Sequence, residues 1–405
     1  MRSLYRRGIL LGGTATALAP AILRHARADQ TPGVTDTEIK IGNTMPYSGP
    51  ISANGTIGRV EAAYFRMINE QGGMNGRKLN FISYDDAGSP PKTVEQTRRL
   101  VEEDGVAFLF NPLGSSNAAA TYKYLNGKRV PHLFISSGAD KWGFPAQHPW
   151  TIGWMPSFRV EARIYARYIK STKPAGKIGI LYQNDDLGKD YVAGVRDGPG
   201  DAFADVVAVS YELTDATIDS QITTLRGAGV DALVTAATPK FAAMTIRKVS
   251  DLDWHPLHVL SFISTSVAAV MIPAGPEHGI GIVSSAYLKD PTDPAWTQDR
   301  GMLAWRDFMA QYYPGGDLKD QYNVYGYAVS QTMVQVLRAC GDDLSRENIM
   351  KQATSLDHFE SPALLPGITV NTSPTNYRPL RQLQMIRWNG KTWERFGDII
   401  EGGDA

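Results

Sequence analysis

The feature that most constrains this 405-residue chain is a repeated alternation of short apolar runs with longer stretches of helical periodicity. In the first such unit, isoleucines alternate with polar residues at 38–42, and apolar residues recur every three or four positions from 57 to 71. The first pattern predicts a strand and the second an amphipathic helix. Strands that alternate with helices in this way are typical of a parallel, doubly wound α/β sheet.

The alternation continues along most of the chain. It next predicts strands at 78–84, 106–110 and 130–135, with helices at 91–103 and 116–128. After an irregular aromatic stretch at 141–158 it predicts helices at 159–172, 187–203, 218–227 and 240–252, with strands at 177–182, 206–211 and 231–235. The last part is predicted to hold a strand at 280–287, helices at 295–313 and 322–340, and strands at 381–388 and 392–396. We therefore expect an α/β fold of two domains.

The first 28 residues have the layout of a cleavable signal peptide. Three arginines in residues 1–7 precede an uncharged stretch at 8–23, which is shorter than the ~20 residues that a membrane-spanning helix needs. Ala26 and Ala28 offer small residues to a signal peptidase, so we expect cleavage after Ala28 and a location in the periplasm. The pair Arg6-Arg7 favours the twin-arginine export route, with the general secretory route as the alternative.

Composition narrows the class of partner. Lys plus Arg and Asp plus Glu both number 41, so nothing favours nucleic acid or an anionic membrane, and a small molecule becomes the expected partner. Cys340 is the single cysteine, so no intramolecular disulfide can form and no cysteine near the cleavage position can carry a lipid. We expect no permanent membrane anchor.

No pattern in the chain nominates a catalytic residue, a metal or a cofactor. His255 and His258 flank Pro256 and are not spaced as metal ligands on a helix. The run 279–281 lacks the third glycine of a dinucleotide-binding loop, and 89–92 is better explained by prolines that begin a helix than by a serine-lysine nucleophile. Cys340 lies among apolar residues, as a buried and inert thiol does. An enzyme is not expected.

Several segments together resemble one family, the periplasmic solute-binding proteins of ABC importers of the leucine/isoleucine/valine-binding type. They are 41–50, 54–55, 68–77, 84–86, 114–116, 131–137 and 182–188. The resemblance covers nearly the whole chain after the signal peptide. It implies two Rossmann-like lobes joined by three crossovers, which close on a ligand by a hinge and deliver it to an inner-membrane ABC permease. Lobe one would hold 36–156 and 287–362, and lobe two 157–286 and 363–405.

Candidate ligand-binding residues follow from strand ends and from the resemblance. In open parallel sheets, ligands bind beyond the carboxyl ends of the strands, where helix N-termini offer unpaired N–H groups. The loops after 106–110 and 130–135 place five small residues there to hold a ligand carboxylate: Ser115, Ser116, Ser136, Ser137 and Gly138. The resemblance adds Asn54, Leu187, Thr238, Ser264 and Tyr327. Tyr322 and Tyr325 are alternatives to Tyr327 because they are equally near.

The departures from the family pattern bear on the ligand. Where amino-acid binders carry an acid for the ligand ammonium, this chain reads Phe262-Ile263-Ser264-Thr265. An unpaired buried ammonium costs several kcal/mol, so the sequence favours an organic acid with an apolar or aromatic body over an α-amino acid. A ligand-sensing protein that reports to a membrane receptor is the alternative function.

Aromatic and acidic residues near the expected cleft allow two interpretations each. Trp142, Trp154 and Phe158 either line the pocket or pack the hinge. The pairs 85–86 and 185–186 each follow a strand and precede a helix, where Asp is more often a cap than a ligand contact.

Overall fold

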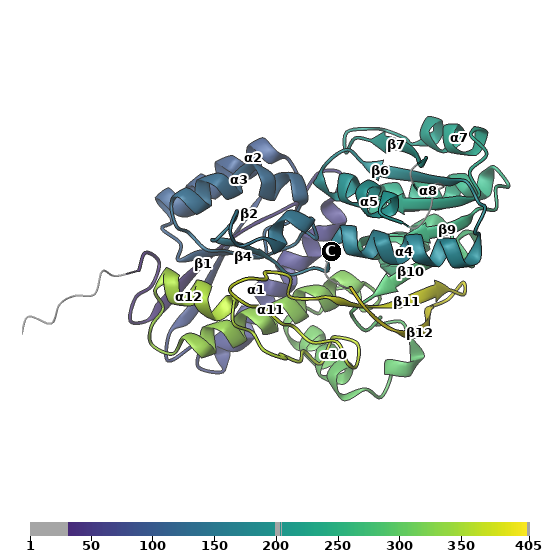
Figure 1. The fold of residues 1–405 in the computed structure, drawn as a ribbon. Coiled ribbons are helices and arrows are strands. Elements are labelled where there is room, and N and C mark those ends of the chain that lie inside the picture. The colour runs from purple at the N-terminus through teal and green to yellow at the C-terminus, as the bar shows by residue number, and fades with distance from the viewer. Residues whose placement is uncertain (1–30, 199–202, 204, 403–405) are drawn as a thin grey trace, which may run out of the picture. The chain divides into compact units, whose positions relative to one another are not determined.

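The computed structural model describes residues 31–198, 203 and 205–402. The predicted signal peptide, with its cleavage after Ala28, lies outside the described residues. From Glu38 onward the chain forms two sheets built mainly of parallel strands, with helices on both faces of each sheet (Figure 1). The predicted α/β class with doubly wound parallel sheets is therefore confirmed.

The first sheet has five parallel strands in the spatial order β2-β1-β3-β4-β5. The strands are β1 (Glu38–Met45), β2 (Lys78–Asp85), β3 (Phe108–Phe110), β4 (His132–Ile135) and β5 (Thr151–Gly153). The short central strands β3 and β4 are buried throughout, as strands covered on both faces must be. The helices packed on this sheet are α1 (Thr56–Glu70), α2 (Pro90–Arg98), α3 (Ser115–Gly127), α11 (Gln321–Cys340) and α12 (Arg346–Ala353). We call this sheet and its helices the first lobe; α10 (Arg300–Tyr312) joins it by packing against α1.

The second sheet has seven strands in the order β12-β11-β10-β9-β8-β6-β7. They are β6 (Ile178–Gln183), β7 (Val207–Tyr211), β8 (Ala232–Ala236), β9 (Leu257–Leu260), β10 (Val283–Ala286), β11 (Gln382–Trp388) and β12 (Trp393–Glu401). The first five are parallel, whereas β11 and β12 form an antiparallel hairpin on the β10 edge. The helices are α4 (Phe158–Thr172), α5 (Asp186–Arg196), α7 (Asp219–Gly227), α8 (Pro239–Asp251) and the short α9 (Ile272–Ala274). This sheet and its helices form the second lobe.

The chain passes between the two sheets three times, at 154–157, 287–299 and 354–381. The returning helix α11 packs on α1, and the two backbones approach closely at Gly326. A Cβ atom added there would lie 3.0 Å from the carbonyl oxygen of Ile57, so any other residue would push the two helices slightly apart and glycine is favoured at this crossing. Elements from distant parts of the sequence thus share one core.

The structure changes several predicted boundaries. The helix predicted at 187–203 is wrong in length, since α5 ends at Arg196. The helix predicted at 295–313 begins only at Arg300, where the Asp299 side chain accepts a hydrogen bond from the Met302 N–H. The strand predicted at 280–287 is confined to β10, because Gly281 has a φ of +90° just before it. The sequence analysis missed β5, β9, α12 and the short α9.

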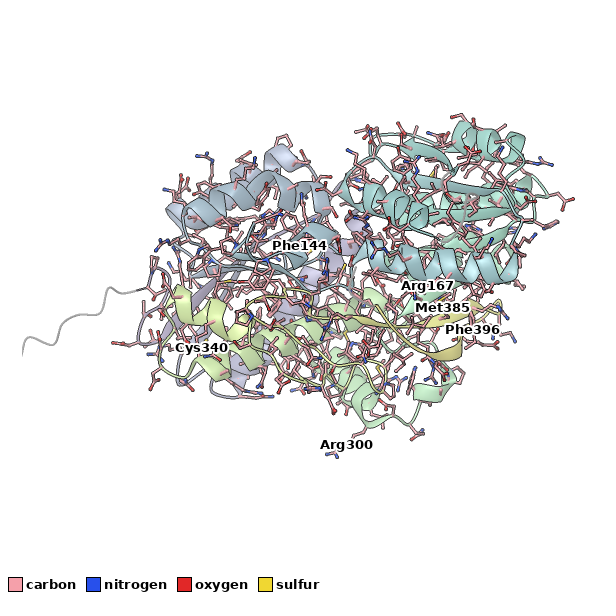
Figure 2. All side chains as sticks on the ribbon, in the orientation of Figure 1. Phe144, Arg167, Arg300, Cys340, Met385 and Phe396 are labelled. Atoms are coloured by element: carbon pink, nitrogen blue, oxygen red, sulfur yellow. The ribbon has the colours of Figure 1, made fainter. Side chains whose placement is uncertain are left out.

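Cys340 is the last residue of α11 (Figure 2). Its side chain is buried, as predicted. Burial raises the pKa of this thiol to about 12. A thiol that stays protonated is a poor nucleophile, which supports an inert structural role. Within the ranges that the structure describes, none of the helices combines the length and apolarity needed to cross a membrane.

Candidate functional site

A cavity opens at the carboxyl ends of strands from both lobes. It encloses about 890 Å³ between atoms, including space open to solvent. The first lobe contributes the N-termini of α3 and α11 and the loops after β1, β3 and β4, while the second contributes the loops after β6, β8, β9 and β10. The carboxyl ends of parallel strands are the usual place for a small-molecule ligand in such folds.

Apolar atoms make most of the cavity surface, and thirteen of the lining residues have apolar or mainly apolar side chains. They are Ile51, Ile57, Leu113, Met155, Phe158, Leu187, Leu213, Pro239, Phe262, Ile263, Ala286, Tyr287 and Leu288. Asp185 is the one ionisable acid among the described lining residues, and none of these is Lys, Arg or His. A solute held here must therefore bury an apolar body, and any negative charge on it must be met by neutral donors.

The N-terminus of α3 supplies such neutral donors. Gly114 precedes the helix with a φ of +111°, a left-handed conformation that favours glycine, and no side chain caps the helix. The first backbone hydrogen bond of the helix is donated by Ala118 N–H to the Gly114 carbonyl, so the N–H groups of Ser115 and Ser116 have no partner within the helix. Both serines line the cavity. An uncapped helix N-terminus of this kind attracts anionic and polar groups.

Ser136 adds an unpaired hydroxyl to the same region. It follows β4, is 5% exposed and lines the cavity. Its Oγ has no hydrogen-bond partner of normal geometry, although the Tyr325 hydroxyl lies near it. Because a buried hydroxyl without a partner is unfavourable, this atom is suited to a ligand or a water molecule.

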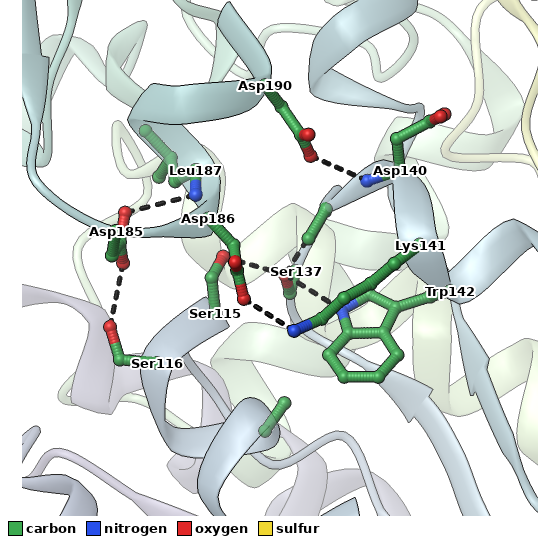
Figure 3. Close-up of polar contacts among 12 residues, drawn as sticks. Ser115, Ser116, Ser137, Asp140, Lys141, Trp142, Asp185, Asp186, Leu187 and Asp190 are labelled. Atoms are coloured by element: carbon green, nitrogen blue, oxygen red, sulfur yellow. Dashed lines mark hydrogen bonds and ion pairs between the residues drawn. The ribbon is translucent and has the colours of Figure 1, made fainter. Parts of the chain in front are cut away.

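Asp185 reaches the α3 N-terminus from the second lobe (Figure 3). Its Oδ2 accepts hydrogen bonds from the Ser116 hydroxyl at 2.8 Å and from Gln183 Nε2 at 2.7 Å. Its Oδ1 accepts from the Leu187 N–H at 3.0 Å, so Asp185 is also the N-cap of α5. The predicted capping role of Asp185 is confirmed. The structure also shows that Asp185 contacts Ser116 of the opposite lobe.

Two further contacts join α5 to the loop after β4 (Figure 3). Lys141 Nζ lies 2.5 Å from Asp186 Oδ2. The backbone N–H of Asp140 donates to Asp190 Oδ2 at 2.7 Å, and burial raises the pKa of Asp190 to about 7. The two lobes therefore touch through polar groups on one side of the cavity.

Glu161 is a buried acid behind the cavity wall that the sequence analysis did not identify. It lies on α4 and is fully buried. Its carboxylate accepts hydrogen bonds from the Phe262 N–H at 3.0 Å, from the Ser285 hydroxyl at 2.5 Å, and from Tyr165 and Tyr191. Phe262 and Ser285 line the cavity, so Glu161 fixes part of its wall. The sequence signal that could have identified Glu161 is the presence of an acid on the apolar face of the predicted helix at 159–172.

Six of the ten predicted site residues line the cavity. They are Asn54, Ser115, Ser116, Ser136, Leu187 and Thr238. The rule that ligands bind at the carboxyl ends of parallel strands predicted the three serines, and the family resemblance predicted the other three, among them the second-lobe residues Leu187 and Thr238.

The other four predicted residues lie outside the cavity wall. Ser137 Oγ is 2.8 Å from Ser115 Oγ, and Gly138 packs against the Phe158 ring; both line a smaller neighbouring cavity of about 220 Å³. Ser264 is fully buried and its hydroxyl donates to the Ala237 carbonyl.

Tyr327 also lies outside the cavity wall. Its ring packs in the first-lobe core, with its centroid 5.3 Å from that of Tyr64 and 5.0 Å from that of Phe308. Instead, Tyr322 and Tyr325 line the cavity, as the alternative interpretation had it.

The aromatic residues near the first crossover divide between the two interpretations. Phe158 lines the cavity. Trp142 packs against Tyr122, and the Trp154 indole N–H donates to Thr332 at 3.1 Å. The tryptophans therefore serve packing. In the part of the chain that the structure describes, no group of three or more His, Cys, Asp or Glu side chains could hold a metal ion.

Comparison with known proteins identifies the fold. A family model described as "Periplasmic binding protein" matches residues 38–392. The chain belongs to this family. A curated relative, Leu/Ile/Val-binding protein homolog 2 of Brucella abortus (strain 2308), is 22% identical over 321 residues, which cover 77% of this chain and 81% of the relative. The relatives are binding proteins of the leucine/isoleucine/valine type, so this chain is a solute-binding protein and not an enzyme.

Solved structures of low sequence identity share the fold. A branched-chain amino acid ABC transporter protein from Thermus thermophilus, with bound valine, has a TM-score of 0.80 at 13% identity and covers 91% of this chain and 97% of its own. A fatty acid ABC transporter substrate-binding protein from Thermomonospora curvata has a TM-score of 0.77 at 20% identity, with 92% and 94% covered. The TM-scores establish that this periplasmic binding protein shares its fold with these structures. Because the sequence identities are low, the likeness is limited to the fold.

Proposed function

We propose that this chain is the periplasmic substrate-binding component of an ABC uptake transporter. In this proposal it captures a small carboxylic acid with an apolar or aromatic body between its two lobes. The acid group would lie at the N-terminus of α3, and the body would lie against the apolar wall. The closed form would then deliver the solute to an inner-membrane permease.

The observation that carries the proposal is the contrast between the cavity wall and its polar end. Thirteen apolar residues line the cavity, while unpaired donors gather at Ser115, Ser116 and Ser136. Apolar burial gives about 25 cal/mol for each Å² of surface removed from water, and a few neutral donors can orient one polar group.

The absence of a free acid argues against an α-amino acid. The segment 262–265 carries no carboxylate. Asp185, the acid in the wall, already accepts hydrogen bonds at both oxygens, and Glu161 behind the wall is enclosed by four donors. A ligand ammonium would have to displace one of these bonds.

One of the similar structures agrees with the proposed solute class. It is named as a fatty acid ABC transporter substrate-binding protein, and a fatty acid is a carboxylic acid with an apolar body. Another holds valine, which has a carboxylate and an apolar body but also carries an ammonium group. The proposal that this chain binds a carboxylic acid with an apolar body rests on the apolar wall of its own cavity.

We further propose that closure is a hinge motion about the three crossovers, with lobe one at 36–156 and 287–362 and lobe two at 157–286 and 363–405. Export would proceed by the signal peptide at 1–28, cleaved after Ala28, to the periplasm.

A thermal-shift screen of the protein from Asp29 onward tests the proposed solute class. The panel would hold amino acids, aromatic carboxylates, aliphatic acids and amides. A ligand at a hundredfold excess over its Kd should add ~2.7 kcal/mol to the unfolding free energy. We expect aromatic or aliphatic acids to raise the melting temperature. A strong shift with leucine or valine and none with aromatic acids would refute the proposed class.

A matched pair of variants locates the binding site. Leu213→Asn places an amide in the apolar wall, and should weaken binding of the solute found in the screen at least tenfold. Leu318→Asn changes an exposed leucine, 48% accessible, and should leave the affinity unchanged. Equal affinities for the two variants would place the site elsewhere.

A further inference from the structure

The hydroxyl of Ser116 is already engaged by the protein. A serine hydroxyl has one hydrogen to donate, and here it is donated to Asp185 Oδ2 at 2.8 Å (Figure 3). Ser116 lies in the first turn of α3, whose unpaired N–H groups are the donors best placed for a ligand carboxylate. An ionised Asp185 therefore makes the Ser116 hydroxyl unavailable to a ligand. Its negative charge also lies beside the place where a ligand carboxylate would bind.

The surrounding charges do not offset that of Asp185. On its own helix Asp186 follows, and Lys141 from the loop after β4 is paired with Asp186 at 2.5 Å. From the first lobe, the buried Asp86 accepts a hydrogen bond from Asn117 of α3 at 3.1 Å. From β7, the Tyr211 hydroxyl donates to Gln183 at 3.1 Å, and Gln183 in turn donates to Asp185. Two carboxylates brought close together here cannot both stay ionised without cost.

We propose that Asp185 couples the capture of a ligand carboxylate to the uptake of one proton, which makes it a specificity-determining residue for charged against neutral solutes. The inference rests on the proposed function of the cavity. The proton stays on Asp185, which then donates to Ser116 Oγ. The Ser116 hydroxyl turns and donates its own hydrogen to the ligand carboxylate. No covalent bond changes apart from the new O–H bond on Asp185.

The local chemistry of Asp185 is suited to this role. Burial raises the pKa of its carboxyl above the ordinary value, and the charge of Asp186 acts in the same direction. Hydrogen bonds from Ser116 and Gln183 oppose the shift, since they stabilise the ionised form. Reversal of the Ser116 hydrogen bond on protonation removes one of these opposing contributions.

A neutral ligand would need no proton. The amide that corresponds to a given acid keeps the apolar body and the carbonyl acceptor but adds no charge beside Asp185. The inference thus predicts that acids and their amides differ in how their binding depends on pH.

Calorimetric titration with matched acids and amides tests the inference. The probes are benzoate, phenylacetate and hexanoate with benzamide, phenylacetamide and hexanamide, measured from pH 5.5 to 8.5 in two buffers of different ionisation enthalpy. The acids stay ionised over this range, because their ordinary pKa values lie near those of Asp and Glu. Above the pKa of Asp185, we expect the Kd of a bound acid to rise about tenfold per pH unit, with close to one proton taken up. The Kd of the amide should not change with pH.

Two variants separate Asp185 from its neighbour. Asn is also a good helix N-cap, so Asp185→Asn should keep α5 intact, and its amide N–H₂ can donate to Ser116 as a protonated Asp would. Acid binding to D185N should be independent of pH. In D186N, which changes a residue outside the cavity wall, the tenfold slope should persist.

The outcomes distinguish this inference from the proposed function. A flat acid affinity with no proton uptake in the wild type, or a slope that survives in D185N, refutes the role of Asp185 while acid binding itself stands. If neither acids nor amides bind to any of the proteins, the proposed solute class is wrong and the inference fails with it.

Discussion

The substitution Glu161→Gln is expected to change how the stability of this protein depends on pH. Burial raises the pKa of the Glu161 carboxyl from its ordinary value of 4.5 to about 7, against the hydrogen bonds from Ser285, Tyr165, Tyr191 and Phe262. Between these two values the folded protein holds a proton that the unfolded chain has lost. The free energy of unfolding must therefore fall as the pH rises through this window, and level off above pH 7.

The magnitude follows from the two pKa values. Each pH unit between them corresponds to about 1.4 kcal/mol, so ionisation of Glu161 should cost the folded state about 3 kcal/mol between pH 4.5 and pH 8. A glutamine side chain at this position would be neutral throughout and similar in shape, so the variant should lack this part of the slope. Relative to the wild type, its unfolding free energy should rise by about 3 kcal/mol across the window.

Urea unfolding followed by tryptophan fluorescence, at half-unit steps from pH 4.5 to 8, measures the difference. Other buried acids, such as Asp190, are present in both proteins, so their contributions cancel. As a control, Glu277→Gln changes an exposed side chain and should alter the unfolding free energy by no more than ~0.5 kcal/mol. A difference between wild type and Glu161→Gln that stays constant over the whole range would show that Glu161 ionises as in the unfolded chain.

Three other changes have defined outcomes. Gly138→Ala should lower the unfolding free energy by about 1–3 kcal/mol and weaken solute binding, because the new Cβ would overlap the Pro156 carbonyl oxygen and lie 2.7 Å from the Phe158 ring. Gly127→Ala should not destabilise, because its Cβ meets nothing within 4 Å, and equal stabilities of the two variants in urea titrations would contradict this prediction. Tyr325→Phe should weaken solute binding several-fold in calorimetry, because Tyr325 lines the cavity. Tyr327→Phe should leave binding unchanged, because Tyr327 packs in the first-lobe core. The reverse result would place Tyr327 in the binding site. Cys340 should react with a thiol reagent only after denaturant is added, so rapid labelling of the folded protein would contradict its burial.

Local patterns predicted most of the fold because most elements carry their own signal. Helices such as α1 and α4 show an apolar stripe with a polar opposite face, and β1 alternates. The missed elements lack that signal. β5 and β9 have three and four residues, too few to show a period, and depend on neighbouring strands for their hydrogen bonds. The eight-residue α12 is mostly polar, so its sequence resembles a loop.

The site was predictable where topology alone decides position. Ser115, Ser116 and Ser136 follow parallel strands and had to share one edge of the sheet. The choice among tyrosines was different. Because α11 is buried over nearly all of its faces, its sequence shows no polar side that would reveal which way Tyr325 and Tyr327 point. The contact between Ser116 and Asp185 joins two lobes and has no sequence signal.

The hairpin of β11 and β12 has a consequence for how the chain folds. β10 pairs with β11, which lies about a hundred residues later in the chain, with Ser284 opposite Ile386. The helix α1 packs against α11, which begins only after residue 320. Such pairings have a high contact order, which slows folding because long loops must close first. The second sheet cannot reach its final set of strands until β11 and β12 are available, and the first sheet lacks its covering helices α11 and α12 until residue 353 has been made. A nascent chain would thus leave sheet edges and helix faces uncovered until synthesis is almost complete, the period when a chaperone would matter most.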